Sequence, residues 1–446
     1  MRLLLILLFL LEIGCVSTPV IRTTIPPLKG LPVLQGYTNN SSTQITVLVP
    51  KGKIISYFVR ANQGEHILEL KNISIQHYSR DDSAWAVDQI KISNLTAGRS
   101  YILEMRDTVG SLVDAREFHT LNLNAQNIHF AAASCMNDRF YNEQKIMWAE
   151  LLSKKPDIIF LLGDSMYATK NRAFFSDILP STLWMSYVQS RLTLDLYRAP
   201  TLVPTLAIWD DGDYGMHDGN REYRYRKESA EIFRIFYAQE PDFVNLIGGP
   251  GISNFFIGFR MGFALMDNRY FRTPNNEKLE DETHWGTAQE EWLLQNIKNF
   301  EKPIWILNGD QIFGGYHKFE SYEGNHPNSF KEIIPRIGAL PEPILFLTGD
   351  RHLTETMLIN EPSLKIKAFE ITTSPLHART FAPTRNELPN KRILEEKRQK
   401  LNYIIVDSSV KNGNLQATVT AFSQNNEILY HRFFSIEKKT KNLKTF

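Results

Sequence analysis

The hydrophobic positions of the chain follow two different patterns, and the change between them falls near residue 123. In the first part, short apolar runs rich in β-forming residues are separated by turn signals. Runs of this length and spacing predict a small β-sandwich. Its strands are expected at residues 44–49, 54–60, 67–70, 89–92, 100–105 and 115–120.

Beyond residue 124, buried apolar runs alternate with helical segments, a pattern typical of a layered α/β fold. Helices are expected at residues 143–153, 185–196, 222–239 and 288–299. Strands are expected at residues 127–132, 157–162, 205–209, 304–307 and 344–348, with two paired strands within 255–266 and further β pattern from 402 to 436.

Two of these strands end in the same way. The runs at 157–162 and 344–348 are rich in Ile, Leu and Phe, which predicts strands buried on both faces. A Gly-Asp pair after one strand is also an ordinary turn, but open α/β sheets bind ligands at the carboxyl ends of their strands. The repetition therefore predicts one metal site built from two strand ends. The residues concerned are Gly163-Asp164 with Tyr167 after the first strand, and Gly349-Asp350 with His352 after the second.

Two further strand ends carry side chains that bind metals. Cys135 follows the strand at 127–132, and Asp210, Asp211, Asp213 and His217 follow the strand at 205–209. Taken singly, Cys135 is more often a buried hydrophobic residue and His217 a surface residue. Together, the four strand ends offer sulfur, nitrogen and oxygen donors, and one carboxylate between two ions can bridge them. Such a site suits phosphoester hydrolysis, because water bound to the metal becomes hydroxide near neutral pH.

Composition narrows the class of protein. A chain of 446 residues exceeds what one hydrophobic core usually organises, so at least two domains are expected. Hydrophobic residues make up 43% and charged residues 22%, as in an ordinary folded soluble protein. Lys and Arg total 50 against 49 acidic residues, and this balance gives no electrostatic reason to expect a nucleic-acid partner.

The N-terminus predicts export. Arg2 precedes an apolar run, residues 3–11, that is too short to span a bilayer but suits the core of a signal peptide. Gly14-Cys15 resembles a bacterial lipoprotein cleavage site, although Glu12 departs from the apolar residue preferred there. We therefore expect a lipid anchor on Cys15 and a place in the bacterial cell envelope. Without lipidation, Cys15 is simply removed or left in the leader.

The expected organisation is a signal peptide at 1–14, a Thr- and Pro-rich tether at 15–30, a β-sandwich at 31–122 and a larger α/β domain at 123–446. Because the chain has only two cysteines, the mature protein keeps Cys135 without a disulfide partner inside a folded domain. An unpaired thiol in an exported protein indicates inert burial, a reactive nucleophile or a metal ligand.

At these positions the sequence resembles the PhoD-like (alkaline phosphatase D) metallophosphatases, relatives of the calcineurin-like phosphoesterases. The resemblance runs from about residue 31 to the end. A cysteine in place of the usual Asp-x-His, together with a tyrosine three residues after Gly-Asp, is peculiar to that family. Residues 92–101 also resemble the corner of a fibronectin type III domain. The matching motifs are Ala133-Ser134-Cys135, Gly163-Asp164 with Tyr167, Ile208-Trp209-Asp210-Asp211 with Asp213-Tyr214-Gly215, Asp267 with Arg269-Tyr270, Gln289 with Trp292-Leu293, and Gly349-Asp350-Arg351-His352.

The resemblance implies a fold and a cofactor. The fold is a four-layer metallophosphoesterase sandwich of mixed sheets flanked by helices, preceded by a small fibronectin III- or Ig-like domain. Cys135 and Tyr167 would bind Fe³⁺, Asp164 would bridge it to one or two divalent ions, and Asp350 and His352 would complete the site. The activity implied is hydrolysis of phosphomonoesters and phosphodiesters, often cell-envelope polymers or nucleotides.

Two positions depart from the family pattern. Gly212 stands where the family has a histidine, and His217 stands where it has an asparagine that binds the divalent metal. The two changes lie five residues apart, which raises the hypothesis that the loop has moved its imidazole. Imidazole suits zinc, manganese or iron better than calcium. The expected divalent ligands are therefore Asp164, Asp211 and His217, with Ca²⁺ or, given His217, Mn²⁺ or Zn²⁺ bound.

These observations predict an exported, metal-dependent alkaline phosphatase or phosphodiesterase that is a monomer. Asp164, His217 and Arg269 are its expected catalytic residues, with Arg269 and Arg191 as candidates to hold phosphate oxygens. The alternative, which Gly212 favours, is a catalytically impaired surface lipoprotein of the same fold that serves as a binding module. Residues 309–315 with Trp184, Tyr214 and Tyr316 are expected either to line the substrate cleft or to pack in the core.

Overall fold

The structure is a computed structural model that describes residues 30–61, 72–168, 177–275, 279–317, 319–360, 362, 364, 367–382 and 387–438. The predicted signal peptide, Cys15, all but the last residue of the predicted tether and the strand expected at 67–70 lie outside the described residues. No helix within the described part of the chain is both long and apolar enough to cross a membrane.

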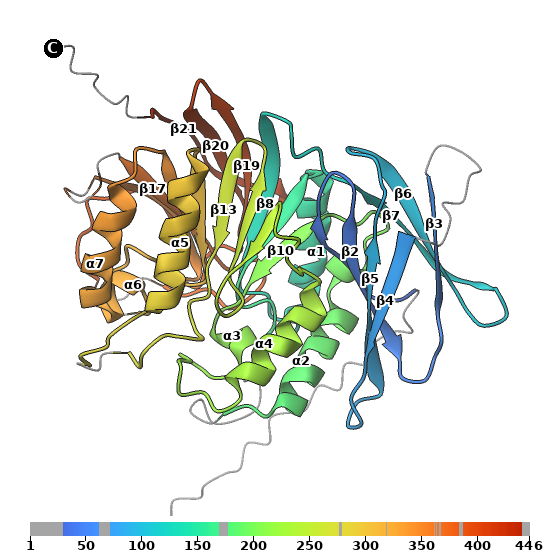
Figure 1. Cartoon of the computed structure of the whole chain (residues 1–446). Coiled ribbons are helices and arrows are strands. Elements are labelled where there is room, and N and C mark those ends of the chain that lie inside the picture. The colour runs from blue at the N-terminus through green and yellow to red at the C-terminus, as the bar shows by residue number, and fades with distance from the viewer. Residues whose placement is uncertain are drawn as a thin grey trace, which may run out of the picture.

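The first part of the chain forms two antiparallel sheets that pack face to face, as expected of a small β-sandwich (Figure 1). Residues from both sheets, such as Val47 and Leu103, fill the core between them. Strands β1 and β4 were not expected from the sequence. One sheet has the order β1 (Val33–Thr38), β2 (Thr43–Pro50), β5 (Trp85–Ile92), β4 (Ile73–Tyr78), and the other has the order β3 (Ser56–Ala61), β6 (Ser100–Arg106), β7 (Leu112–His119).

Two larger sheets form the centre of the remaining chain (Figure 1). Their inner faces meet through interlocked rings, with Phe130 edge-on to Phe263 and to Trp305, and Phe160 stacked on Phe263. The six-stranded sheet runs β10 (Thr205–Ile208), β9 (Ile158–Leu162), β8 (Asn127–Ala133), β19 (Tyr403–Lys411), β20 (Asn414–Phe422), β21 (Ile428–Ile436). The eight-stranded sheet runs β11 (Leu246–Gly248), β12 (Asn254–Gly258), β13 (Met261–Leu265), β14 (Ile304–Asn308), β15 (Ile344–Thr348), β17 (Ala368–Thr373), β16 (Leu353–Ile359), β18 (Ile393–Arg398).

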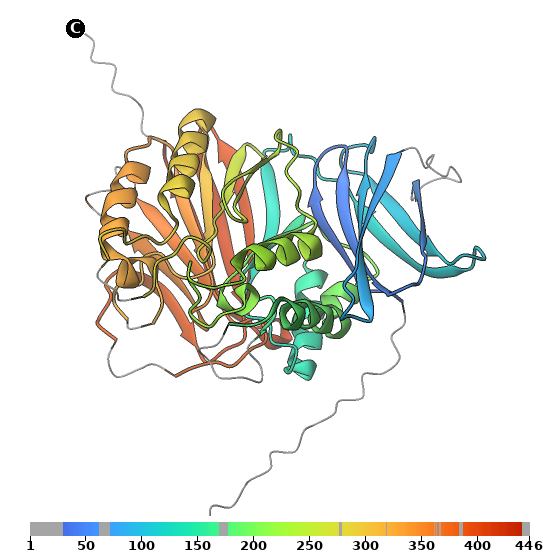
Figure 2. The ribbon, with the colours of Figure 1, turned by 60° about the horizontal axis from the view of Figure 1, so that its bottom comes forward.

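Helices cover both outer faces of the paired sheets, so the expected four-layer sandwich is confirmed. Trp148 and Leu183 share a core with Leu161 of the six-stranded sheet, while Leu293 and Ile333 share a core with the outer face of the eight-stranded sheet. Figures 1 and 2 show the two groups of helices on opposite sides. The helices are α1 (Tyr141–Ser153), α2 (Pro180–Thr193) and α4 (Arg226–Tyr237) on one side and α5 (Thr287–Phe300) and α7 (Pro327–Gly338) on the other, with the short α3 (Asp211–Tyr214) and α6 (Tyr322–Asn325) and the 3₁₀ turns Asp195–Arg198 and Gln424–Asn426.

The helix ends differ from the expected ones for local reasons. The helix expected at 185–196 starts earlier, because Pro180 occupies its first turn, where a missing N–H costs no hydrogen bond. Helix α7 was not expected, and it contains Pro335 in its interior. Its apolar side chains, including Ile333 and Ile337, are wholly buried on the sheet. We infer that this burial keeps α7 helical in spite of the proline.

The sandwich docks on the larger part through apolar side chains such as Leu34 and Leu48, which share a core with α4, and through polar contacts. The Gln44 amide pairs with the backbone of Glu240, and the Tyr37 hydroxyl donates to Asp242. The backbone of Gly36 approaches the end of α4 so closely that a Cβ there would lie 2.3 Å from the Ala238 carbonyl. The division into separate domains at residues 122 and 123 stays a prediction.

Candidate metal centre

Four of the predicted ligands stand in a strained backbone conformation at one edge of the two sheets. Cys135, Asp164, Asp350 and His352 have φ angles of 57°, 53°, 62° and 53°. Side chains other than glycine seldom adopt this left-handed conformation, and it costs about 1–3 kcal/mol where the surrounding structure imposes it. Each residue lies just beyond the carboxyl end of β8, β9 or β15, which are parallel strands within their sheets.

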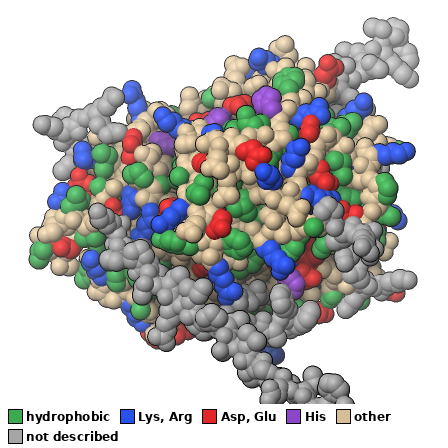
Figure 3. All heavy atoms as spheres, turned by 180° about the vertical axis from the view of Figure 1, so that it is seen from behind, with side chains coloured by type: hydrophobic (Ala, Val, Ile, Leu, Met, Phe, Trp, Pro, Cys, Tyr) green, Lys and Arg blue, Asp and Glu red, His purple; other side chains and the backbone are tan. Residues whose placement is uncertain are grey.

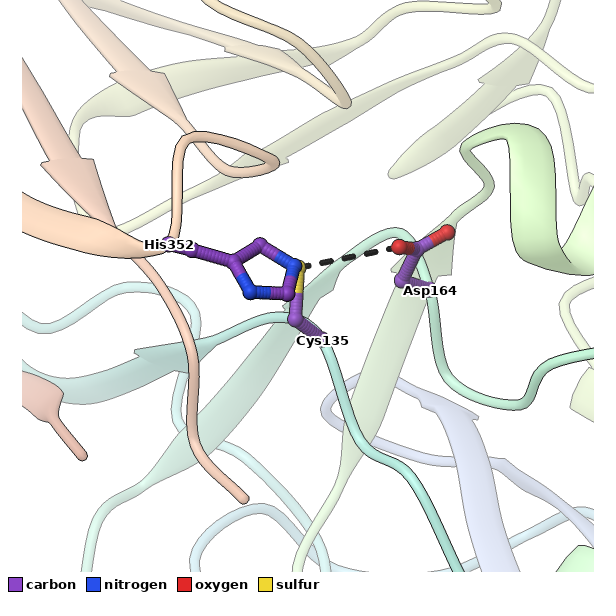
Figure 4. A group of neighbouring side chains, drawn as sticks. All are labelled: Cys135, Asp164 and His352. Atoms are coloured by element: carbon purple, nitrogen blue, oxygen red, sulfur yellow. Dashed lines mark hydrogen bonds between the residues drawn. The ribbon is translucent and has the colours of Figure 1, made fainter. Parts of the chain in front are cut away.

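Cys135, Asp164 and His352 form the innermost group. Their ligand atoms lie within 4.8 Å of one another, and Figure 4 shows the three side chains converging. The Cys135 sulfur is 3.7 Å from Oδ2 of Asp164 and accepts a hydrogen bond from the Ser374 hydroxyl at 3.0 Å. His352 bonds the Arg379 carbonyl through Nδ1, which leaves Nε2 for a ligand, as is usual in metal-binding histidines.

Tyr167 and Asp350 stand beside this group. The Tyr167 hydroxyl is buried and has no hydrogen-bond partner among the described residues. Burial raises the pKa of Tyr167 well above its usual value, and the nearby Asp164 and Cys135 raise it further. Burial is the first cause that raises the pKa of Asp350, and the charge of Asp210 is the second. The Cys135 sulfur is 4.0 Å from the Asp350 carbonyl oxygen.

A second acidic group adjoins the first through Asp164. One oxygen each of Asp164, Asp210 and Asp211 lies within 4.8 Å of the others. Burial raises the pKa of Asp210 to about 8 and that of Asp213 to about 7, and it raises the pKa of Asp164 well above its usual range. Oδ2 of Asp210 and Oδ1 of Asp213 have no hydrogen-bond partner among the described residues.

This donor set fits bound cations. Carboxylates that are buried together repel one another and stay charged only when a cation compensates them. The partnerless hydroxyl of Tyr167, which lies beside the Cys135 group, is an oxygen that such a cation would engage. Burial also raises the pKa of the Cys135 thiol, with Asp164 as the next cause, so a nearby cation is needed for the thiolate to form.

His217 reaches the same edge from the loop after α3. Its Nδ1 lies 2.7 Å from Oδ2 of Asp211, and this hydrogen bond raises the pKa of His217 to about 9. Burial works to raise the pKa of Asp211, but the hydrogen bond from His217 and the charge of Arg269 outweigh it, and the pKa falls below its usual value. Asp211, His217 and Asp218 form a third group whose ligand atoms lie within 4.8 Å of one another.

The structure explains why position 212 is a glycine. Its backbone N–H donates to Oδ1 of Asp164 at 2.9 Å. A Cβ at this position would lie 2.7 Å from that same oxygen and 2.7 Å from the Met166 carbonyl oxygen. The loop therefore has no room for a histidine in place of Gly212, and the imidazole at the edge of the site comes from His217.

Arg269 lies behind the site rather than in it. It is wholly buried, and its guanidinium donates to Asp210 at 2.6 Å and to Glu320 at 2.7 Å. Among the described residues it is not part of the cavity wall. Arg191 lies elsewhere, 4.0 Å from the ring centre of Tyr197, and donates to the Phe236 carbonyl. Neither arginine therefore stands where it could hold a phosphate oxygen directly.

A buried polar network that sequence reasoning missed supports the acidic group. The Asn268 amide donates to Asp210 at 2.8 Å and to Asp310 at 2.9 Å, and Arg272 pairs with Asp310 and Glu320. Gly309-Asp310 after β14 repeats the Gly-Asp signal of the two predicted strands, and this repetition was the available clue. The motif residues Asp267 and Gln289 are structural, because Asp267 accepts from the Trp209 indole and Gln289 pairs with the Asp267 backbone.

A cavity of about 510 Å³ opens over the predicted ligands. Trp184, Tyr214 and Tyr316, which the sequence placed either in the cleft or in the core, are buried packing residues and are not part of its described wall. The wall includes Asp164, Tyr167, Asp211, His217, Asp350 and His352, together with Asn275, Phe319, Glu320, Arg351, Phe381, Glu387 and Arg398. On the rear face of the molecule, the described residues show acidic and basic side chains mixed together, without a large patch of one charge (Figure 3).

The chain is similar in fold to a solved structure described as the structure of PhoD, with a TM-score of 0.67. The two share 15% sequence identity, and the match covers 93% of this chain and 94% of the other. A second solved structure, that of astrotactin-2, has a TM-score of 0.17 and 7% identity over 47% of this chain and 37% of its own, too weak to support an argument. No curated protein sequence matches the chain.

The family comparison agrees with the position of the site. The model of the PhoD-like phosphatase family matches residues 130–424. This range contains Cys135, Asp164, His217 and His352, and it spans both central sheets from β8 to β20. With most of its length matched by that model, the chain belongs to the PhoD-like phosphatase family.

Proposed function

We propose that the protein hydrolyses phosphomonoesters or phosphodiesters with the help of bound metal ions. The observation that supports this most is the convergence of Cys135, Asp164 and His352 within 4.8 Å, linked through Asp164 to the group of Asp210 and Asp211. Asp164, Asp211 and His352 of this centre line a cavity large enough for a small organic substrate.

The two oxygens of Asp164 favour a bridging role. Oδ2 lies 3.7 Å from the Cys135 sulfur, while Oδ1 accepts from the N–H of Gly212, and one of the two oxygens lies within 4.8 Å of Asp211. On this proposal Fe³⁺ would be held by Cys135, Tyr167, Asp164, Asp350 and His352, and a divalent ion would be held by Asp164, Asp211 and His217. When bound, such ions supply Lewis acidity for the phosphoryl group and activate water. Arg269 acts as a positioning residue, because it holds Asp210 in place.

Metal removal tests the proposal. Purified full-length protein is expected to hydrolyse bis(4-nitrophenyl) phosphate or 4-nitrophenyl phosphate and to lose this activity to a chelator. Because His217 offers nitrogen, Mn²⁺ or Zn²⁺ should restore activity better than Ca²⁺. The matched variant, His217→Asn, is expected to reverse this preference. The measurement is the initial rate as each metal is titrated back.

Two outcomes of this assay would contradict parts of the proposal. A wild-type protein that is loaded with metal but inactive on both esters would support the alternative, a catalytically impaired binding module of the same fold. If His217→Asn leaves the order of metals unchanged, His217 is no ligand, and its contact with Asp211 only orients that carboxylate.

We further propose that the protein is exported and held to a membrane by a lipid on Cys15. In cells of a bacterial host, the wild-type protein is expected in the membrane fraction. Cys15→Ala is expected to move it to the soluble fraction or to leave an unprocessed precursor. Immunoblots of fractionated cells provide the measurement, and a wild-type protein found only in the soluble fraction would contradict the anchor.

A further inference from the structure

Arg351 is a buried arginine in the cavity wall, and two of its three guanidinium nitrogens lack a hydrogen-bond partner among the described residues. It stands between the predicted ligands Asp350 and His352, and its side chain is 3% exposed. Neither Nε nor Nη2 has a hydrogen-bond partner among the described residues. Leaving buried charged donors unpaired is costly, and the cost is removed when a ligand accepts from them.

The acidic side chains near Arg351 do not satisfy its unpaired Nε and Nη2 donors. Its Nη2 is 3.6 Å from Oε1 of Glu387, beyond a good charge-assisted hydrogen bond. Arg398 already binds both oxygens of Glu387, at 3.0 and 2.6 Å. Glu355 is near enough for Arg351 to lower its pKa, but its carboxylate accepts from Tyr316 and Gln311 instead.

Aromatic side chains line the same part of the cavity. The Arg351 guanidinium lies 4.8 Å from the ring centre of Phe319. Phe381, with 46% of its surface exposed, stands 4.9 Å from the His352 ring, measured between ring centres. A guanidinium stacked on a ring keeps its edge donors free, and that edge matches the two oxygens of a carboxylate or a phosphate.

We propose that Arg351 binds a second anionic group of the substrate, carried on the alcohol portion of the phosphate ester. The reacting phosphate lies at the metal ligands, and the rest of the molecule extends along the cavity to Phe319, Phe381 and Arg351. The preferred substrate is then a phosphate ester whose alcohol portion bears a carboxylate or another phosphate. This inference rests on the proposed function, because it assigns the reacting phosphate to the centre described above.

Binding of a matched pair of phosphonates tests the inference without turnover. Phenylphosphonate and 4-carboxyphenylphosphonate differ only in one carboxylate, and isothermal titration of the full-length, metal-loaded protein measures both. The wild type is expected to bind the carboxylated probe about 10–100-fold more tightly, the range for a charge-assisted hydrogen bond to a buried arginine. Arg351→Gln is expected to bind both probes equally, while Arg351→Lys keeps part of the preference because it keeps the charge.

A control variant separates this effect from a general change of charge. Arg336→Gln removes an exposed arginine of α7 that pairs with Glu291 at 2.6 Å, and it is expected to keep the full preference. The inference is overturned if the wild type shows no preference or binds neither probe, or if Arg351→Gln weakens both probes equally. It is also overturned if that variant lowers the melting temperature but keeps the preference, because Arg351 would then only neutralise Glu387 and Glu355.

The inference and the proposed function fail separately. A protein that hydrolyses simple phosphate esters but shows no preference dependent on Arg351 retains the proposed function and loses this inference. A protein with that preference but no hydrolysis of any phosphate ester loses the proposed function and retains an anion-binding site at Arg351.

Discussion

Replacement of Cys135 by serine is expected to remove iron and to lower phosphoesterase activity by more than 100-fold. Even changes outside the ligand shell cost about 10–100-fold in metal affinity or activity, and Cys135 is a proposed ligand. Its sulfur is wholly buried beside Asp164, and a hydroxyl in its place would supply no negative charge. Thiolate and phenolate bound to Fe³⁺ absorb visible light, so the wild type should be coloured and Cys135→Ser colourless. Absorbance, metal content and initial rate are the measurements.

The control for this variant is a measurement that its fold is unchanged. Cys135→Ser should keep the circular dichroism spectrum of the wild type, because the β-sandwich and the two sheet cores do not depend on the sulfur. A colourless wild type whose activity is unchanged by Cys135→Ser would contradict the iron site. Cys135 would then be a buried structural thiol.

Gly212→Ala is expected to weaken metal binding by at least tenfold, although it adds only one methyl group. The new Cβ would lie 2.7 Å from both Oδ1 of Asp164 and the Met166 carbonyl oxygen, closer than carbon and oxygen atoms approach. Either Asp164 turns away or the loop moves and lengthens the Gly212–Asp164 hydrogen bond. Both responses displace the proposed bridging carboxylate. Metal titration of the apoprotein measures the loss.

Two variants make this result specific. Gly52→Ala, in a turn of the β-sandwich where an added Cβ meets no atom within 4 Å, is expected to leave metal binding unchanged. Gly212→His restores the side chain of the family pattern and should weaken binding more than Gly212→Ala does, because a larger group enters the same space. Higher activity of Gly212→His than of the wild type would refute the steric argument.

The sequence by itself located most of the proposed centre. Buried apolar runs that end in Gly-Asp are local signals, and they identified Asp164 and Asp350. Parallel strands place their carboxyl ends at one edge of their own sheet. Because β9 and β15 belong to different sheets, Asp164 and Asp350 also come together through the packing of the two sheets. The β-sandwich followed from the length and spacing of the strands, whereas the four layers and the family followed from the resemblance that the motifs carry. Their outcome is confirmed by the fold and by the family match.

Only the tertiary structure decided which residues support the centre and which line the cavity. Asn268 bonds both Asp210 and Asp310 because β13, β14 and the six-stranded sheet end at the same edge, and no local pattern records a contact across 58 or 42 positions. The crowding at Gly212 depends on how closely β9 and the loop after β10 approach each other. The surroundings of the arginines were likewise decided by tertiary packing. Arg269 and Arg191 have the right chemistry to hold phosphate but are buried away from the described cavity wall, whereas Arg351 lines the cavity. Local sequence determines which side chains are available, but long-range packing determines which of them remain unpaired.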